Sequence, residues 1–124
     1  VETLGIATFA ADLYGDGKVV KQPEEASSLM MPLFLDREEL RKRVVLTFDT
    51  VSKQQGVKSK RVGAVGFCFG GLAAIELFRS GSAVVGVAAF HTLLGDTQNG
   101  QRAKTVSLAE NIQGRILILN GYRD

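Results

Sequence analysis

The sequence predicts an α/β protein with a mostly parallel sheet flanked by helices on both faces. Short apolar stretches alternate along the chain with longer stretches of helical periodicity, an order typical of parallel sheets. Residues 62–66 form an apolar run of the kind found in strands buried on both faces. With it, the expected strands lie at about residues 5–11, 62–66, 83–90 and 115–120.

Helices are expected between these strands. Pro23 begins a short helix that Pro32 interrupts, and Asp36 with Glu39 forms a capping box for a longer helix that ends at Gly56. On this longer helix, basic residues alternate with acidic ones, which indicates a solvated face rather than an anion site; the basic residues are Arg37, Arg41, Lys42 and Arg43. Further helices are expected at residues 70–80 and near 104–112.

Composition fits one globular domain. The 124 residues are 45% hydrophobic and carry a net charge of +2, and they contain no apolar run as long as a membrane span. We therefore expect no nucleic-acid and no membrane partner. A single Cys permits no internal disulfide and fits a reducing, cytoplasmic location, and the start at Val1 indicates a cut boundary rather than a signal peptide.

The most informative segment is Gly66-Phe67-Cys68-Phe69-Gly70-Gly71, where the strand pattern meets a helix pattern. A Gly-x-nucleophile-x-Gly turn is so sharp that side chains two positions from the nucleophile would collide, so Gly66 and Gly70 fit it. Gly71 lets the helix pack closely on the sheet. The turn leaves Cys68 at the carboxyl edge of the strand and at a helix N-terminus, which favours the thiolate. The N–H of Phe69 then supplies half of an oxyanion hole.

There is one other interpretation of this segment. Cys68 could be a small core residue in a glycine-rich turn such as a dinucleotide-binding loop. The glycine spacing disfavours that loop, because the frame through Gly63, Gly66 and Gly70 lacks the Gly-x-Gly-x-x-Gly order.

The motifs resemble those of the dienelactone hydrolase family of α/β-hydrolases. Its members use Cys in a Gly-x-Cys-x-Gly-Gly elbow and carry a Gly-x-x-Asp acid, here matched by Gly66–Gly71 and Gly121-Tyr122-Arg123-Asp124. Residues 5–15, which include Asp12-Leu13-Tyr14, resemble the family's strand ending in Asp-Leu/Met-Tyr. Gly15 and Asn120 depart from the family pattern, which has a substrate-binding Arg and a common His at these positions.

The resemblance implies a partial α/β-hydrolase domain over residues 1–124, in which Cys68 is the nucleophile and Asp124 the orienting acid. Tyr14 ends its strand at the same edge and is a possible substrate contact, although a Tyr at a sheet rim is as often only structural. The family's catalytic His follows the acid, whereas the single His91 precedes Asp124 and is expected to be structural.

The function implied is hydrolysis of a small-molecule carboxylic ester or lactone without metal or cofactor. The family's oxyanion strand lies before Val1 and its His after Asp124, so we expect this chain alone to be inactive and to form swapped or homo-oligomeric assemblies. The alternative is a noncatalytic or thiol-sensing relative in which the elbow persists as architecture.

Overall fold

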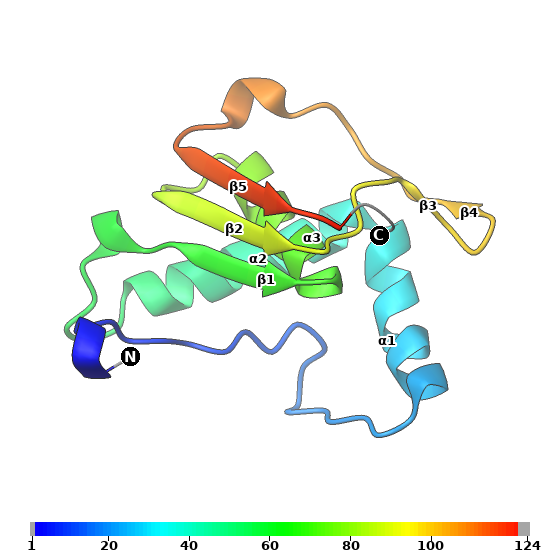
Figure 1. Ribbon diagram of the computed structural model, residues 1–124, viewed down its shortest axis with the longest axis horizontal. Coiled ribbons are helices and arrows are strands. Elements are labelled where there is room, and N and C mark those ends of the chain that lie inside the picture. The colour runs from blue at the N-terminus through cyan, green and yellow to red at the C-terminus, as the bar shows by residue number, and fades with distance from the viewer. Residues whose placement is uncertain (1, 122–124) are drawn as a thin grey trace.

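Three parallel strands form the central sheet of the computed structural model, which describes residues 2–121 (Figure 1). The sheet order is β1 (Ala64–Phe67), β2 (Gly86–Phe90) and β5 (Arg115–Leu119). The register pairs Val65 with Ala88 and Ala88 with Leu117. The predicted α/β class with a parallel sheet is confirmed. A two-stranded antiparallel ribbon, β3 (Thr97–Gln98) and β4 (Gln101–Arg102), projects from the loop after β2.

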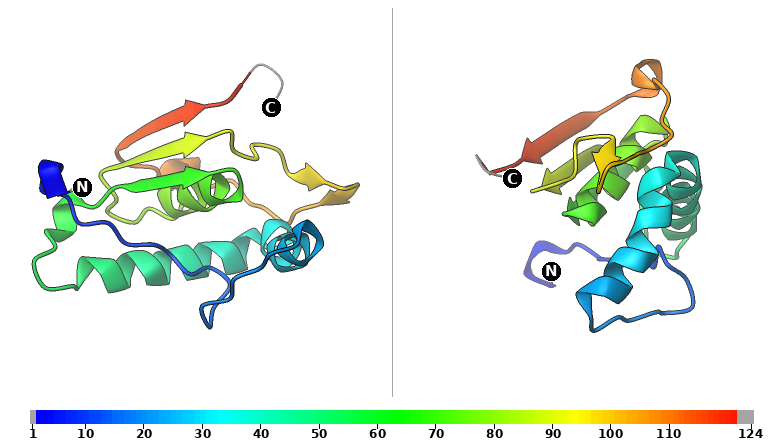
Figure 2. Two further views of the ribbon diagram at one scale, coloured as in Figure 1. Left: turned by 60° about the horizontal axis from the view of Figure 1, so that its bottom comes forward. Right: turned by 90° about the vertical axis from the view of Figure 1, so that its right-hand side faces the viewer.

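Helices are layered behind one face of this sheet (Figure 2). Helix α3 (Phe69–Arg79) packs on β1 and β2, and α2 (Arg37–Ser52) packs on α3. Because α3 lies between the sheet and α2, it is buried nearly all round, as its apolar sequence predicts. The core comes mainly from these elements and consists of Leu33, Phe34, Leu40, Val44, Phe69, Leu72, Ala73, Ala74, Leu77, Phe78, Val84, Val87 and Ala103.

Helix α1 (Pro23–Leu35) joins α2 through a single residue. The backbone N–H of Asp36 donates to the carbonyl of Pro32, which closes α1, while the Asp36 carboxylate accepts from the N–H of Glu39 at 3.0 Å and caps α2. Asp36 is thus the N-cap that the sequence predicts, but the predicted capping box is only half formed, because the Glu39 carboxylate accepts from Arg43 and not from the Asp36 N–H. Pro32 does not break α1, since the helix runs on to Leu35.

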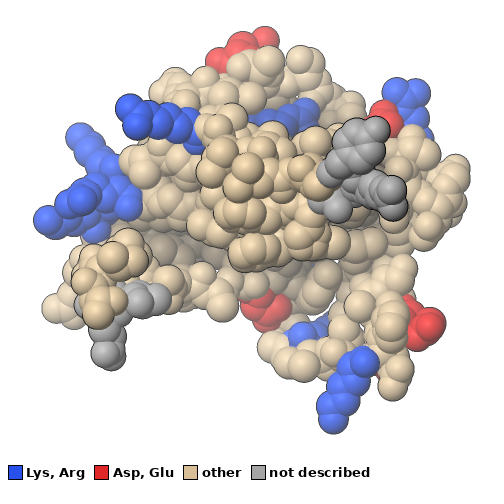
Figure 3. Space-filling view, viewed as in Figure 1, with Lys and Arg blue, Asp and Glu red and all other residues tan. Residues whose placement is uncertain are grey.

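The other face of the sheet is uncovered within residues 2–121. Val65 and Phe67 of β1 are 68% and 61% exposed, and Leu117 and Leu119 of β5 are 52% and 49% exposed. Parallel register places these side chains on one face, which is the broad tan surface at the centre of Figure 3. The expectation of helices on both faces is thus met on one face only by the described residues.

Two expected elements differ from the structure. Residues 6–11 are exposed and form no strand, because a strand needs a neighbour for its N–H and C=O groups and the described residues supply none there.

The helix expected near residues 104–112 is also missing, since this stretch holds only the 3₁₀ turn η3 (Ala109–Asn111). Arg79 donates to the carbonyl of Val106, which ties this stretch to α3 in a non-helical conformation. Two further 3₁₀ turns are η1 (Glu2–Leu4) and η2 (Ser59–Arg61).

Candidate active site

Cys68 occupies the turn between β1 and α3 in a strained conformation. Its φ and ψ are 51° and −119°, a combination that a non-glycine residue rarely adopts. The Cys68 N–H donates to the Phe90 carbonyl at 3.0 Å, which continues the sheet ladder, while its own carbonyl accepts from Gly71 N–H at 3.0 Å and begins α3. The residue is exposed. The strand and the helix together hold its side chain outward at the carboxyl edge of the sheet.

The glycines around Cys68 have different reasons for lacking a side chain. A Cβ on Gly66 would lie 2.0 Å from the Gly70 carbonyl oxygen, and one on Gly71 would lie 2.7 Å from Cβ of Thr92. These contacts support the predicted need for glycine at positions 66 and 71. The predicted collision at Gly70 is wrong: a Cβ there would meet no atom within 4 Å, and it is the Gly70 carbonyl that occupies the space beside Gly66.

Phe69 is the first residue of α3, where an α-helix supplies no acceptor for the backbone N–H. The Phe69 N–H therefore has no acceptor within its own helix, and its role in an oxyanion hole stays a prediction. Its side chain is buried and anchors the start of the helix in the core.

Tyr14 lies beside the elbow. Its ring stacks on Phe69 with centroids 6.4 Å apart and planes within 5°. Burial raises the pKa of the Tyr14 phenol, and the nearby Cys68 raises this pKa further. The phenol thus stays protonated near neutral pH and is a hydrogen-bond donor close to Cys68.

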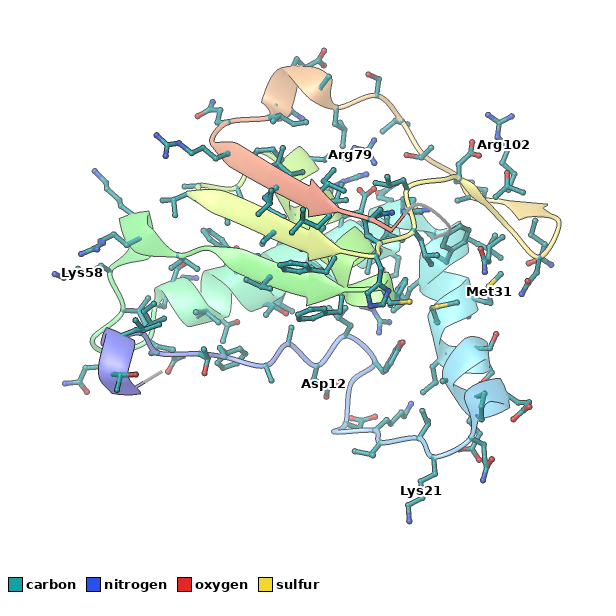
Figure 4. All side chains as sticks on the ribbon, in the orientation of Figure 1. Asp12, Lys21, Met31, Lys58, Arg79 and Arg102 are labelled. Carbon is teal, nitrogen blue, oxygen red and sulfur yellow. The ribbon has the colours of Figure 1, made fainter. Side chains whose placement is uncertain are left out.

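A short loop holds Tyr14 in place, and sequence reasoning did not find the residues that order it. The Asp12 carboxylate accepts from Gly15 N–H at 2.9 Å and Gly17 N–H at 2.8 Å, and Arg43 donates to the Leu13 carbonyl at 2.8 Å. The bonds from Gly17 and then Gly15 lower the pKa of Asp12. Asp12 lies on the N-terminal segment below β1 in Figure 4. The Asp-x-x-Gly-x-Gly spacing is the signal that could have predicted this loop.

The carboxyl ends of β2 and β5 meet beside the elbow. Thr92 N–H donates to Asn120 Oδ1, and Asn120 Nδ2 donates to the Thr92 carbonyl, both at 3.0 Å. His91 precedes this pair with φ 35°, and its ring centroid is 6.4 Å from that of Phe67. Asp124 lies outside the described residues, so its catalytic role stays a prediction.

The loop at residues 92–104 is held to the helices by hydrogen bonds. Arg37 donates to the Gly95 carbonyl at 3.0 Å, and Lys104 N–H donates to the Leu35 carbonyl at 2.8 Å. The Glu76 carboxylate is fully buried in α3 and pairs with Arg37, Arg41 and Arg79. The prediction that Arg37 and Arg41 belong to a solvated face is wrong: Arg37 is 4% exposed, because Glu76 draws both guanidinium groups inward.

Hollows of about 310 and 300 Å³ on the described surface lie away from Cys68. The first borders residues 18–20 and α1, and the second lies over α3 and the loop after β2. Among residues 2–121, no three side chains of His, Cys, Asp or Glu cluster as metal ligands would. None of the helices in the described part of the chain has the length and apolarity needed to cross a membrane.

A strained, outward-facing nucleophile candidate between a parallel strand and a helix is the hallmark of the α/β-hydrolase elbow. Residues 2–124 match the model of the dienelactone hydrolase family, so the chain belongs to that family. A search of curated proteins found no match.

Solved structures give the same result. The chain is similar to the protein named m3DLH, with 37% identity and a TM-score of 0.76 over 90% of this chain and 44% of that one. It is also similar to the dienelactone hydrolase-like promiscuous phosphotriesterase P91 from metagenomic libraries, with 33% identity and a TM-score of 0.83 over 98% of this chain and 48% of that one. The chain therefore spans about half the length of these two relatives.

Proposed function

We propose that the protein containing this chain hydrolyses carboxylic ester or lactone bonds with Cys68 as the nucleophile. The observation that carries the proposal is the backbone of Cys68, whose φ of 51° aims an exposed thiol away from the sheet at the N-terminus of α3. Strain of this kind persists only where surrounding contacts enforce it, and here β1, α3 and Gly66 do so.

The reaction runs in two steps. The Cys68 thiolate attacks the carbonyl carbon, the Phe69 N–H and the Tyr14 phenol donate to the carbonyl oxygen, and the C–O bond to the alcohol breaks as the alcohol takes a proton. Water then attacks the thioester, releases the carboxylic acid and restores the thiol. The family pattern assigns proton transfer to a His that follows Asp124, with Asp124 orienting it. The 124-residue chain alone is accordingly inactive or nearly so.

The test compares the complete protein with its Cys68→Ala and Cys68→Ser variants on p-nitrophenyl acetate and on a lactone. Loss of the nucleophile lowers kcat by about 10⁴-fold or more, and mass spectrometry of the wild-type protein after rapid mixing detects an acetyl group on the peptide that contains Cys68. Rapid alkylation of Cys68 by iodoacetamide at pH 7 accompanies turnover.

Other outcomes contradict the proposal. Slow alkylation together with no turnover favours a noncatalytic or thiol-sensing relative. The similarity to P91 makes a phosphotriester such as paraoxon a useful third substrate, because hydrolysis of paraoxon without ester or lactone turnover would assign a different substrate class to the same elbow.

A further inference from the structure

We propose that Asn120 is a positioning residue whose side chain ties the carboxyl end of β5 to the elbow that holds Cys68. The inference rests on the proposed function. Backbone pairing between β2 and β5 ends where His91 N–H donates to the Leu119 carbonyl at 2.8 Å. One residue further on, the Asn120 amide takes over and bonds both backbone polar groups of Thr92 at 3.0 Å.

The Asn side chain acts here as a substitute for a peptide group. It presents one acceptor and one donor side by side, which match the N–H and C=O of Thr92. Thr92 is 4% exposed, so without the Asn120 amide its backbone N–H and C=O would be buried away from water with no partner in place of that amide. The pair therefore holds the ends of two strands together after their backbones have begun to turn apart.

Thr92 carries this constraint to the elbow. Its side chain packs against the first turn of α3 so closely that a Cβ on Gly71 would lie 2.7 Å from Thr92 Cβ. Gly71 N–H in turn donates to the Cys68 carbonyl at 3.0 Å. A continuous set of contacts thus runs from Asn120 at the end of β5 through Thr92 and Gly71 to Cys68.

The test uses the complete protein and the variants Asn120→Ala, Asn120→Asp and, as a matched control, Asn111→Ala. Asn111 is an amide of the same size at η3, away from the elbow. Asn120→Ala lowers kcat for p-nitrophenyl acetate about 10- to 100-fold and leaves KM within about twofold, because the nucleophile and its partners lose their alignment while substrate binding is kept. Asn111→Ala leaves both constants unchanged. Urea denaturation establishes that each variant is folded under the assay conditions.

The pH dependence of Asn120→Asp separates positioning from stability. The introduced carboxyl accepts from Thr92 N–H in either charge state, but it donates to the Thr92 carbonyl only when protonated. The ratio of variant to wild-type kcat therefore rises as the pH falls toward the pKa of this carboxyl. A loss of stability alone leaves the ratio flat wherever both proteins are folded.

Two results would overturn the inference: an Asn120→Ala protein that is folded and retains wild-type kcat, or an Asn120→Asp ratio that is flat with pH. If the wild-type protein hydrolyses no ester, the proposed function fails instead. Two other measurements then decide whether Asn120 has a positioning role. They are the pH dependence of the alkylation rate of Cys68 and the rate of hydrogen exchange at Thr92. A changed alkylation profile with faster Thr92 exchange in Asn120→Ala supports the positioning role, and an unchanged profile rejects it.

Discussion

Gly66 and Gly70 are equivalent in the sequence motif but not in space. The spacing around Cys68 predicts the elbow, because only glycine tolerates so tight a turn. Sequence cannot show which glycine has no room for a side chain, since that depends on where the carbonyl of Gly70 points. In the structure this oxygen faces the Cα of Gly66, whereas the position of a Gly70 side chain is open.

We predict opposite effects of alanine at these two glycines. Gly66→Ala puts a methyl group 2.0 Å from a backbone atom, so the turn must open, and the free energy of unfolding falls by at least about 3 kcal/mol. Gly70→Ala adds a helix-favouring residue in open space and stabilises by up to about 1 kcal/mol. Urea denaturation of both variants measures the difference, and equal midpoints would contradict it.

Candidate site residues outside the motif are harder to predict. Cys68, Phe69 and Tyr14 are candidates from the sequence alone because each lies next to a recognisable pattern. Asn120, Thr92 and Asp12 act through contacts with backbone groups, and two of these contacts join residues 28 positions apart. Only the fold brings such partners together.

At the scale of elements, α2, α3 and the loop after β2 are joined by one buried carboxylate. Glu76 lies on a helix whose apolar sequence predicts burial. Two of its partners, Arg37 and Arg41, lie on α2, whose charged face the sequence predicts to be solvated. The pairing depends on how α2 crosses α3, which local patterns do not encode. Arg79 at the end of α3 extends the network to Thr105 and Val106, and its side chain lies above β5 in the view of Figure 4.

We predict that Glu76→Gln is strongly destabilising. Three guanidinium groups would face each other without their common carboxylate, at a cost of about 3–5 kcal/mol in the free energy of unfolding. The matched control is Glu38→Gln, which removes the exposed i,i+4 pair with Lys42 and leaves the denaturation midpoint nearly unchanged. Chemical denaturation compares the two. A Glu76 variant no less stable than the Glu38 variant would show that the network is not needed for folding.

At the scale of the whole molecule, the parallel order and three of the four expected strands follow from the sequence. The exception is residues 5–11, where the pattern is apolar but the described residues offer no partner strand. The open face of the sheet likewise has no covering element among the described residues. Its side chains are apolar, as in a covered strand, and the chain spans only about half the length of m3DLH and P91.

We predict that the isolated 124-residue chain associates with itself through this face. Val65, Phe67, Leu117 and Leu119 form a contiguous apolar surface that water disfavours. Leu117→Glu and Val65→Glu shift the chain toward monomer in size-exclusion chromatography with light scattering. Leu46→Glu, at a still more exposed leucine of α2, does not. A monomeric wild-type chain with one cooperative melting transition would refute the prediction.

The double use of Asp36 limits how the molecule can move. The Asp36 N–H bonds to the last turn of α1, and the Asp36 carboxylate caps the first turn of α2. The bond from Lys104 N–H to the Leu35 carbonyl holds the same corner from outside. No spare residue exists there to act as a hinge. A movement of α1 near Met30 and Met31 therefore moves α2 with it as one rigid body, or else it begins at the residues before Pro23.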